Sequence, residues 1–316
     1  MYDVVALGEL LIDFAQQSVD ESGYPTMAAH PGGAPGNFLA ALNQYGASTA
    51  FLGKVGDDTF GRLLIGTLKE AGIETRGIVV DPTVFTTLAF VTFKDGDRSF
   101  SFARKPGADT MLRFDEVDLS LIDQTKVFHF GSLSLTGEPV RTATRQAIAY
   151  AKEQGKLITY DPNLRPPLWD SQEQAREEIL WGLHQADVVK ISDEEVTFLW
   201  NCDEEEGARK LLEECGVKLA MVTLGPKGCY LRNRNGSVTV SSPKVKPIDT
   251  TGAGDIFGGS AVSRLLKLGK APEDLDQAEL EGIARFASTA ASLSTEHPGG
   301  IPSIPAESVV LERMKG

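Results

Sequence analysis

Short apolar runs alternate along most of this chain with longer segments whose apolar residues recur at helical spacing. The short runs predict buried strands, and the periodic segments predict helices. The predicted strands cover residues 4–8, 49–55, 127–130, 157–160, 187–191, 219–224 and 237–240, and the predicted helices cover 38–45, 58–72, 138–154, 172–184, 257–268 and 282–293, with two short helices after residue 192. This succession predicts an α/β fold, in which helices cover both faces of a mostly parallel sheet. Ligands bind beyond the carboxyl ends of the strands in such sheets.

Residues 85–104 break the alternation. Strand-like residues at 87–93 and 99–103 flank a polar turn at 94–97, which predicts a hairpin. A hairpin inserted among strand–helix units predicts a small sheet that projects from the main body. We therefore assign residues 1–14, 31–84 and 105–316 to a main α/β domain, and residues 15–30 and 85–104 to the projecting sheet.

The chain is acidic, since its 316 residues carry 31 basic and 44 acidic side chains, a formal net charge of −13. This balance argues against nucleic acid and anionic membrane as partners, because both attract basic surfaces. It leaves a nucleotide ligand open, since a metal ion and backbone amides can offset phosphate charge. No apolar run approaches membrane-spanning length, and the start of the chain lacks a secretion signal, so we expect a cytoplasmic protein.

The most informative stretch is the run DTTGAGD at residues 249–255, between a predicted strand and a predicted helix. Gly252, Ala253 and Gly254 predict a small-residue turn at a helix start, where unpaired N–H groups and the positive end of the helix dipole form an anion site. Asp255 follows in the first helical turn. It has two interpretations: it stabilises the helix start, or it is a general base for a hydroxyl that attacks phosphorus.

Further candidate residues lie near the ends of predicted strands or in the loops between predicted elements. Asp13 is either a solvated loop acid or an acceptor for sugar hydroxyls. The Gly-rich run 32–37 predicts a loop that leads into a helix, as a tight turn or as a place for close ligand approach. Prolines stiffen the loop 161–169, and Ser192 with Glu195 forms a capping-box pattern. Neither a P-loop nor a GxGxxG motif is present.

Two of these runs together resemble the ribokinase, or pfkB-type, carbohydrate kinases. DTTGAGD is similar to the C-terminal signature of that family, and the segment 32–61 resembles its N-terminal signature. The run DPNLRPPLW at 161–169 is similar to one found in bacterial fructokinases. The resemblance implies a three-layer ribokinase-like α/β fold, with a mostly parallel central sheet and a small projecting β-lid over the sugar.

The resemblance also implies roles for individual residues. Asp255 would be the general base, and Gly252, Ala253 and Gly254 would form the anion hole. The implied sugar ligands are Asp13, Gly33, Asn37, Arg104, Asn163 and Arg165. The implied nucleotide-binding residues are Thr223, Gly225, Gly228, Ala287 and Ser288. Glu195 would organise Mg²⁺ through water, although Ser192 replaces the usual asparagine of that motif, and Asp249 and Thr251 would lie near a monovalent cation, K⁺.

The function implied by the resemblance is ATP-dependent phosphorylation of a sugar primary hydroxyl, with Mg²⁺ and ATP. The run at 161–169 favours D-fructose as the acceptor and fructose 6-phosphate as the product. The alternatives are a 2-keto-3-deoxygluconate kinase, a ribokinase or a riboside kinase of the same fold. A non-catalytic, sugar-sensing relative is an alternative of another class. We expect a homodimer.

Overall fold

Alternate residues of strand β1 (Tyr2–Leu7) are buried against different helices. Val4 and Ala6 pack with helix α1 (Ala34–Gln44), whereas Val5 and Leu7 belong to the core on the opposite side. Because side chains alternate across a strand, this apolar run places β1 in a sheet that is covered on both faces. The short apolar run at residues 4–8 predicted a buried strand, and the structure confirms this prediction.

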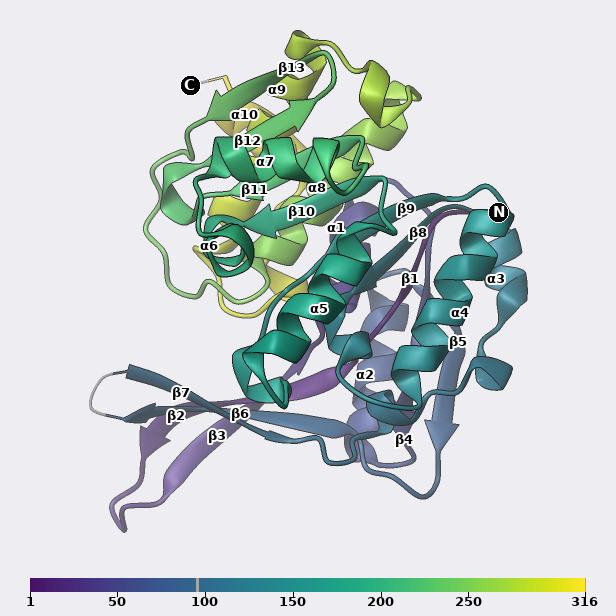
Figure 1. The fold of residues 1–316 in the computed structure, drawn as a ribbon. Helices are drawn as coiled ribbons and strands as arrows, with labels where there is room; N and C mark the ends of the chain where they lie inside the picture. Colours follow the sequence, from purple (N-terminus) through teal and green to yellow (C-terminus); the bar gives the residue numbers. More distant parts are fainter. Residues whose placement is uncertain (95–96, 316) are drawn as a thin grey trace.

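The computed structural model describes residues 1–94 and 97–315. Within these residues a nine-stranded sheet forms the centre of the molecule (Figure 1). Its order is β13 (Gly236–Val240), β12 (Cys229–Asn233), β11 (Leu219–Thr223), β10 (Val188–Ser192), β9 (Leu157–Asp161), β8 (Thr125–Gly131), β1, β4 (Thr49–Gly56) and β5 (Glu74–Asp81). The strands from β11 to β5 are parallel, and β12 and β13 are antiparallel additions.

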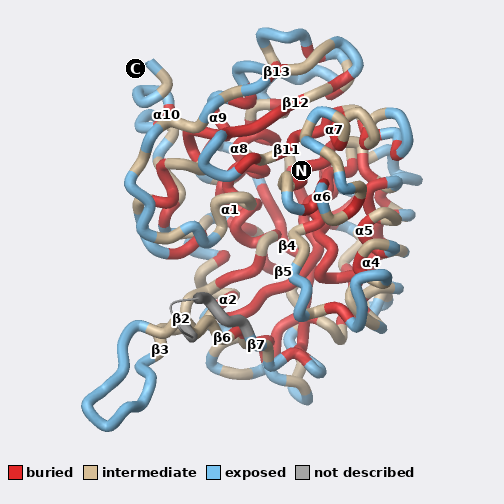
Figure 2. Tube along the Cα trace, turned by 60° about the vertical axis from the view of Figure 1, so that its left-hand side comes forward, coloured by how far each residue is buried: buried red, intermediate tan, exposed pale blue. Residues whose placement is uncertain are grey.

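Helices cover both faces of this sheet and confirm the predicted three-layer arrangement. One face carries α1, α2 (Thr59–Glu70), α8 (Ala253–Leu268), α9 (Gln277–Ser294) and α10 (Glu307–Arg313). The other face carries α3 (Leu119–Asp123), α4 (Val140–Glu153), α5 (Gln172–Leu183), α6 (Asp193–Trp200) and α7 (Glu204–Glu213). Figure 2 shows the buried residues concentrated in the sheet strands and the inner sides of these helices.

A second, four-stranded sheet projects from the main body (Figure 1). Its order is β3 (Pro25–Gly32), β2 (Leu11–Val19), β6 (Thr87–Lys94) and β7 (Asp97–Ala103). The predicted hairpin is present as β6 and β7, which pair antiparallel; residues 95 and 96 of its predicted turn lie outside the described residues. The sheet also includes Leu11–Val19, so Asp13 lies within a strand rather than in a loop after the first strand.

Helix α9 and strand β5 are two of the elements that differ from the sequence-based prediction. Helix α9 begins at Gln277 rather than near 282, because Asp276 and Glu279 form a capping box that holds an additional turn. Strand β5 was not predicted, since its polar and apolar residues do not form a continuous apolar run. In the described part of the chain, no helix combines the length and apolar character that crossing a bilayer requires.

Candidate active site

The start of α8 faces the carboxyl ends of the parallel strands. Gly252 takes a left-handed conformation, with φ 75°, and Ala253 is the first residue of the helix. The N–H of Ala253 donates to the carbonyl of Thr250 at 3.3 Å. The N–H groups of Gly254 and Asp255 belong to the first helical turn, which has no acceptors within its own helix. This turn therefore has the geometry of an anion site.

Asp255 is held at this turn by a residue from the other end of the chain. Asn37, on α1, donates from Nδ2 to Oδ2 of Asp255 at 2.9 Å. The side chain of Asn37 is buried, yet its Oδ1 has no hydrogen-bond partner among the described residues. An unsatisfied buried acceptor is costly in an empty site, and a ligand hydroxyl would satisfy it.

The electrostatic environment of Asp255 has opposing parts. Burial raises the pKa of its carboxyl above the ordinary value, and Asp13 adds to this rise. The hydrogen bond from Asn37 and the charges of Lys190 and Arg165 lower that pKa. A carboxylate that is partly desolvated and remains near several charged groups is typical of a catalytic base.

Asp13 points from β2 toward the same region. Burial raises the pKa of Asp13 to about 6, Arg165 opposes this rise, and Asp249 contributes to it. These electrostatic interactions place Asp13, Arg165, Asp249 and Asp255 around one site, although they come from four separate segments.

The resemblance implies that Asp13 accepts hydrogen bonds from the sugar, and from that role it follows that sugar binding should depend on the charge of Asp13. Because only the carboxylate accepts hydrogen bonds at both oxygens, we expect the KM for the sugar to rise as the pH falls through about 6. Asp13→Asn should raise KM about ten- to hundred-fold above that pH, the effect of losing a charged hydrogen bond, and it should flatten the pH dependence of KM. Steady-state kinetics across this range measure both effects. If KM depended on pH in Asp13→Asn as it does in the wild type, Asp13 would not be the group whose charge controls sugar binding.

Gly33 lies at a close approach between two segments. Its φ is 120°, and it precedes the first residue of α1. A methyl group there would overlap the carbonyl oxygen of Glu9. The Glu9 carboxyl, which is buried, accepts from the N–H of Ala34 at 2.9 Å and so fixes the same turn.

Gly33→Ala should therefore destabilise the fold by at least about 1–3 kcal/mol, the usual cost of a strained backbone conformation. Gly66 offers the matched control, because it lies inside α2 with open space around its Cα. Gly66→Ala should stabilise the protein by about 0.5–1 kcal/mol through helix propensity. Urea unfolding measures both changes, and equal unfolding midpoints for the two variants would contradict this account of Gly33.

Hydrogen bonds to two carboxylates fix the backbone of the loop after β9. Asn163 has a left-handed backbone, with φ 47°, and its N–H donates to Oδ1 of Asp161 at 3.2 Å. The N–H of Leu164 donates to Oε1 of Glu195 at 2.7 Å. Arg165 is exposed, and its guanidinium donates to the carbonyl of Leu164 at 3.1 Å. The predicted stiff loop thus holds Arg165 beside the site.

Sequence reasoning missed a buried ion pair at this edge of the sheet. Lys190 on β10 contacts both carboxylate oxygens of Asp161, at 3.1 and 3.3 Å. A lysine within the apolar run Val188–Ser192 was the available signal, because a buried charge needs a partner. The partner itself lies on another strand and cannot be read from local sequence.

Arg104 has a structural environment that the sequence did not predict. It is buried, and its guanidinium contacts Asp109 at 2.7 Å, Thr136 at 2.9 Å and the carbonyl of Leu133 at 2.8 Å. Asp109 also accepts a hydrogen bond from Thr87, the first residue of β6. Arg104 therefore joins the base of the small sheet to the main body, and its role as a sugar ligand stays a prediction.

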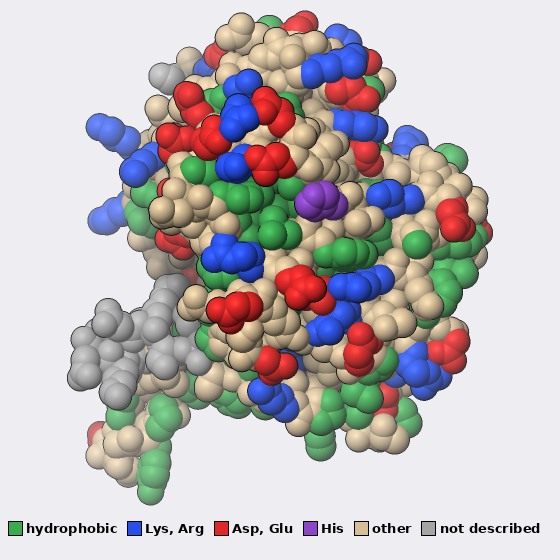
Figure 3. Space-filling model, viewed as in Figure 1, with side chains coloured by type: hydrophobic (Ala, Val, Ile, Leu, Met, Phe, Trp, Pro, Cys, Tyr) green, Lys and Arg blue, Asp and Glu red, His purple; other side chains and the backbone are tan. Residues whose placement is uncertain are grey.

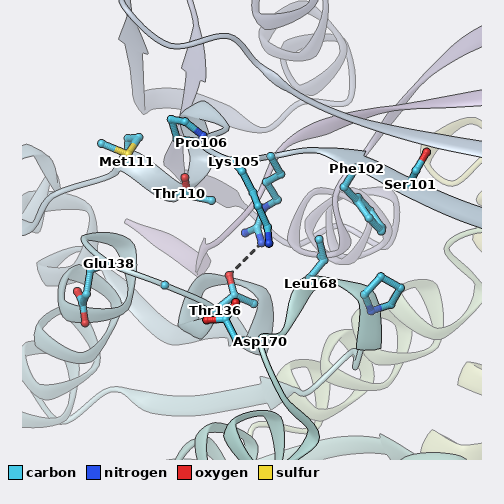
Figure 4. A pocket seen from close by; sticks show the side chains of 13 residues that line it. Ser101, Phe102, Lys105, Pro106, Thr110, Met111, Thr136, Glu138, Leu168 and Asp170 are labelled. Carbon is cyan, nitrogen blue, oxygen red and sulfur yellow. Dashed lines mark hydrogen bonds between the residues drawn. The ribbon is translucent and has the colours of Figure 1, made fainter.

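Arg104 also lines a cavity of about 420 Å³. Figure 4 shows Phe102, Lys105, Thr136 and Leu168 around this cavity, with the dashed contact from Arg104 to Thr136. Phe102 pairs with Ala89 on β6, which in turn pairs with Asp13 on β2. Since laterally paired residues share one face of a sheet, the side chains of Phe102 and Asp13 lie on the same side of the small sheet.

The predicted nucleotide residues form a second group, near β11 to β13. Thr223 ends β11 and donates to the carbonyl of Ile191 at 3.4 Å. Gly225 and Gly228 both have positive φ, at 55° and 123°. Ser288 on α9 hydrogen-bonds to Ser242 at 3.0 Å, whereas Ala287 is fully buried in the core. Packing thus accounts for Ala287, and nucleotide contacts from this group stay a prediction.

The predicted cation ligands are already engaged with the protein. The carboxylate of Glu195 accepts hydrogen bonds from the N–H and the hydroxyl of Ser192, which confirms the predicted capping box. It also accepts a hydrogen bond from the N–H of Leu164. This arrangement fits contact with a metal through water better than direct ligation. Asp249 accepts from the N–H and hydroxyl of Thr251 and from the N–H of Gly299. Among the residues that the structure describes, no cluster of three or more His, Cys, Asp or Glu side chains could hold a metal ion.

The charged side chains on the face seen in Figure 3 are of both signs and interspersed. The described side chains on this face form no continuous basic surface of the kind that nucleic acids bind.

Comparisons with known proteins agree with the fold and with the signature runs. A family model described as pfkB family carbohydrate kinase matches residues 1–307. Fructokinase-1 of Zea mays is 44% identical over 315 residues, which span 98% of this chain and 96% of the maize protein. The crystal structure of a fructokinase from Xylella fastidiosa with bound ATP has a TM-score of 0.92 and 30% identity, over 100% of this chain and 99% of that chain.

A second solved structure is a fructokinase double mutant from Vibrio cholerae O395, in a form with fructose, ADP and potassium ion bound. Its TM-score is 0.85 at 31% identity, over 99% of this chain and 98% of that chain. These matches confirm the resemblance seen in the two signature runs, and the chain therefore belongs to the pfkB family of carbohydrate kinases.

Proposed function

We propose that this chain transfers the γ-phosphoryl group of ATP to the primary 6-hydroxyl of D-fructose. One observation carries the proposal: the carboxylate of Asp255 is held by Asn37 at the first turn of α8. That arrangement sets a proton acceptor beside an anion site. The names of the maize, Xylella and Vibrio relatives support fructose as the acceptor and ATP as the donor.

Asp255 takes the proton from the 6-hydroxyl as that oxygen attacks phosphorus. The backbone N–H groups of the turn formed by Gly252, Ala253 and Gly254 stabilise the charge on the transferring phosphoryl oxygens. Asn37 orients Asp255 through Nδ2. Its unpartnered Oδ1 accepts a hydrogen bond from a sugar hydroxyl. A single bound sugar thus satisfies a buried acceptor and presents its hydroxyl to the base.

The acceptor lies between the small sheet and the loop after β9. Asp13 and Gly33 contact the sugar from one side, and Asn163 and Arg165 contact it from the other. The cavity lined by Phe102, Arg104 and Leu168 extends this space and falls within the usual range for small-molecule sites of about 300–1,000 Å³. The small sheet, formed by β2, β3, β6 and β7, acts as a lid that excludes water from the reaction.

The nucleotide lies along the carboxyl ends of β10 and β11. Thr223, Gly225 and Gly228 contact its phosphates and ribose, and Ala287 and Ser288 border the adenine. Glu195 would hold a bound Mg²⁺ through water, and the ion would supply positive charge to offset the ATP phosphates. Asp249 and Thr251 would lie near a bound K⁺. We also propose a cytoplasmic homodimer; light scattering should give twice the mass of one chain.

A coupled assay of ADP release across a panel of acceptors tests the proposal. We expect the highest kcat/KM with D-fructose and lower values with 2-keto-3-deoxygluconate, ribose and a riboside. A higher value with any of these three would reassign the acceptor within the same reaction class. Binding of ATP and fructose without any release of ADP would contradict an enzymatic function and favour a sugar sensor.

A further inference from the structure

We propose that Lys190 is a positioning residue for this reaction: its buried ammonium lies between Asp161 and the first turn of α8 and keeps Asp255 in the ionised, proton-accepting form. This inference rests on the proposed function and deepens it. The side chain does not need to touch the substrate, because it acts through Asp255.

Strand β10 of the central sheet fixes the position of Lys190. Its Nζ contacts the two oxygens of Asp161 on the neighbouring strand β9, at 3.1 and 3.3 Å. On its other side it lies against Gly254, where a Cβ atom would be only 2.9 Å from Nζ. Any larger residue at 254 would compete with the ammonium for this space. The sequence Gly254-Asp255 therefore places the charge of Lys190 directly beside the residue that precedes the base.

Asp255 lies among charged groups from several elements. The acids that interact with Asp255 are Asp13 on β2 and Asp161 on β9, the cations are Lys190 on β10 and Arg165 after β9, and Asn37 on α1 is a neutral donor. One step further away, Glu195 on α6 interacts with Asp161 and Lys190, Asp249 before α8 interacts with Asp13, and His129 on β8 interacts with Lys190. The two acids oppose ionisation of the base, and the two cations favour it.

The two cations are not equivalent. Arg165 is exposed, so water and salt screen its charge, whereas Lys190 is buried. Charges interact more strongly where the surrounding dielectric is low. Burial alone would lower the pKa of Lys190, but Asp161, Glu195 and Asp255 raise it above its ordinary value, so the ammonium remains charged. Burial also lowers the pKa of His129 to about 3, and this histidine therefore adds no positive charge.

A purely structural role is the competing interpretation, since Lys190 and Asp161 could simply join two strands. The two roles differ in their pH dependence. Loss of a structural contact lowers kcat by a similar factor at every pH. Loss of a charge beside the base moves the acidic limb of the kcat profile, because that limb reports ionisation of the base in the complex.

The test is a set of kcat profiles with fructose and MgATP across roughly pH 5 to 9. The variants are Lys190→Met, Asp161→Asn and the double variant, with Lys126→Met as control. Lys126 forms an ion pair with Asp3 at the protein surface, with its side chain 57% exposed. Thermal unfolding of every variant identifies any that do not fold.

We expect Lys190→Met to move the acidic limb up by about one pH unit, the usual effect of losing an adjacent opposite charge. Asp161→Asn should move it down, since it removes a like charge, and Lys126→Met should leave it in place. The acidic limb of the double variant should lie at a higher pH than that of Asp161→Asn. This last comparison isolates Lys190 without leaving an unpaired buried carboxylate, so it decides the question even if Lys190→Met does not fold.

The inference is overturned if the wild-type enzyme is active and the variants lose activity while the acidic limbs of their kcat profiles stay at the wild-type pH. A wild-type protein that releases no ADP with fructose at any pH would instead remove the proposed function, and this inference with it.

Discussion

Asp255→Asn should lower kcat by about 10² to 10⁴, the usual contribution of a general base. Asparagine has nearly the same shape and keeps an oxygen that can accept the hydrogen bond from Asn37. It cannot take up the proton of the attacking hydroxyl. We therefore expect MgATP affinity, measured by calorimetry, to stay close to that of the wild type while fructose-dependent ADP release falls.

Asp57→Asn is the matched control for this change. Asp57 lies on the surface before α2, where it pairs with Arg62 and its side chain is 57% exposed. The same chemical substitution there should leave kcat unchanged. Wild-type turnover in Asp255→Asn would show that another group removes the proton.

Arg104→Met should destabilise the fold by about 3–5 kcal/mol, because it leaves Asp109 buried without its partner. The side chains of Arg104 and Asp109 are only 4% and 1% exposed. The pair also joins the end of β7 to the main body, so the small sheet should lose its attachment at this point. Urea unfolding measures the change in free energy.

Two further variants separate the charge from the packing. Arg104→Met combined with Asp109→Asn should recover part of the lost stability, since no unpaired charge remains. Arg113→Met removes an exposed partner of Asp115 and should leave the unfolding midpoint unchanged. An Arg104→Met protein as stable as the wild type would contradict the structural role that we assign to this pair.

Local pattern predicted the layers of the fold. The run from Val4 to Leu7 has apolar residues on both sides of a strand, and this alone required a sheet covered on two faces. Helix α8 ended at residue 268 as predicted, since the left-handed conformation that follows at Gly269 suits glycine. The capping box of Ser192 and Glu195 also formed as the spacing indicated.

The contacts that assemble the site were out of reach of local pattern. Asn37 and Asp255 are 218 residues apart, and only the folded sheet brings them together. The pair of Lys190 and Asp161 joins two strands in the same way. For Arg104, sequence resemblance indicated a sugar ligand but could not show that Asp109 and Thr136 already occupy its donors.

In the mechanism that we propose, the first turn of α8 holds the transferring phosphoryl group while Asp255 deprotonates the sugar. Phosphorus NMR of the products from fructose and MgATP is the test of this mechanism. We predict a phosphomonoester coupled to the protons of carbon 6, formed in equal amounts with ADP. Release of inorganic phosphate with ADP, or a phosphate attached at carbon 1, would contradict the account.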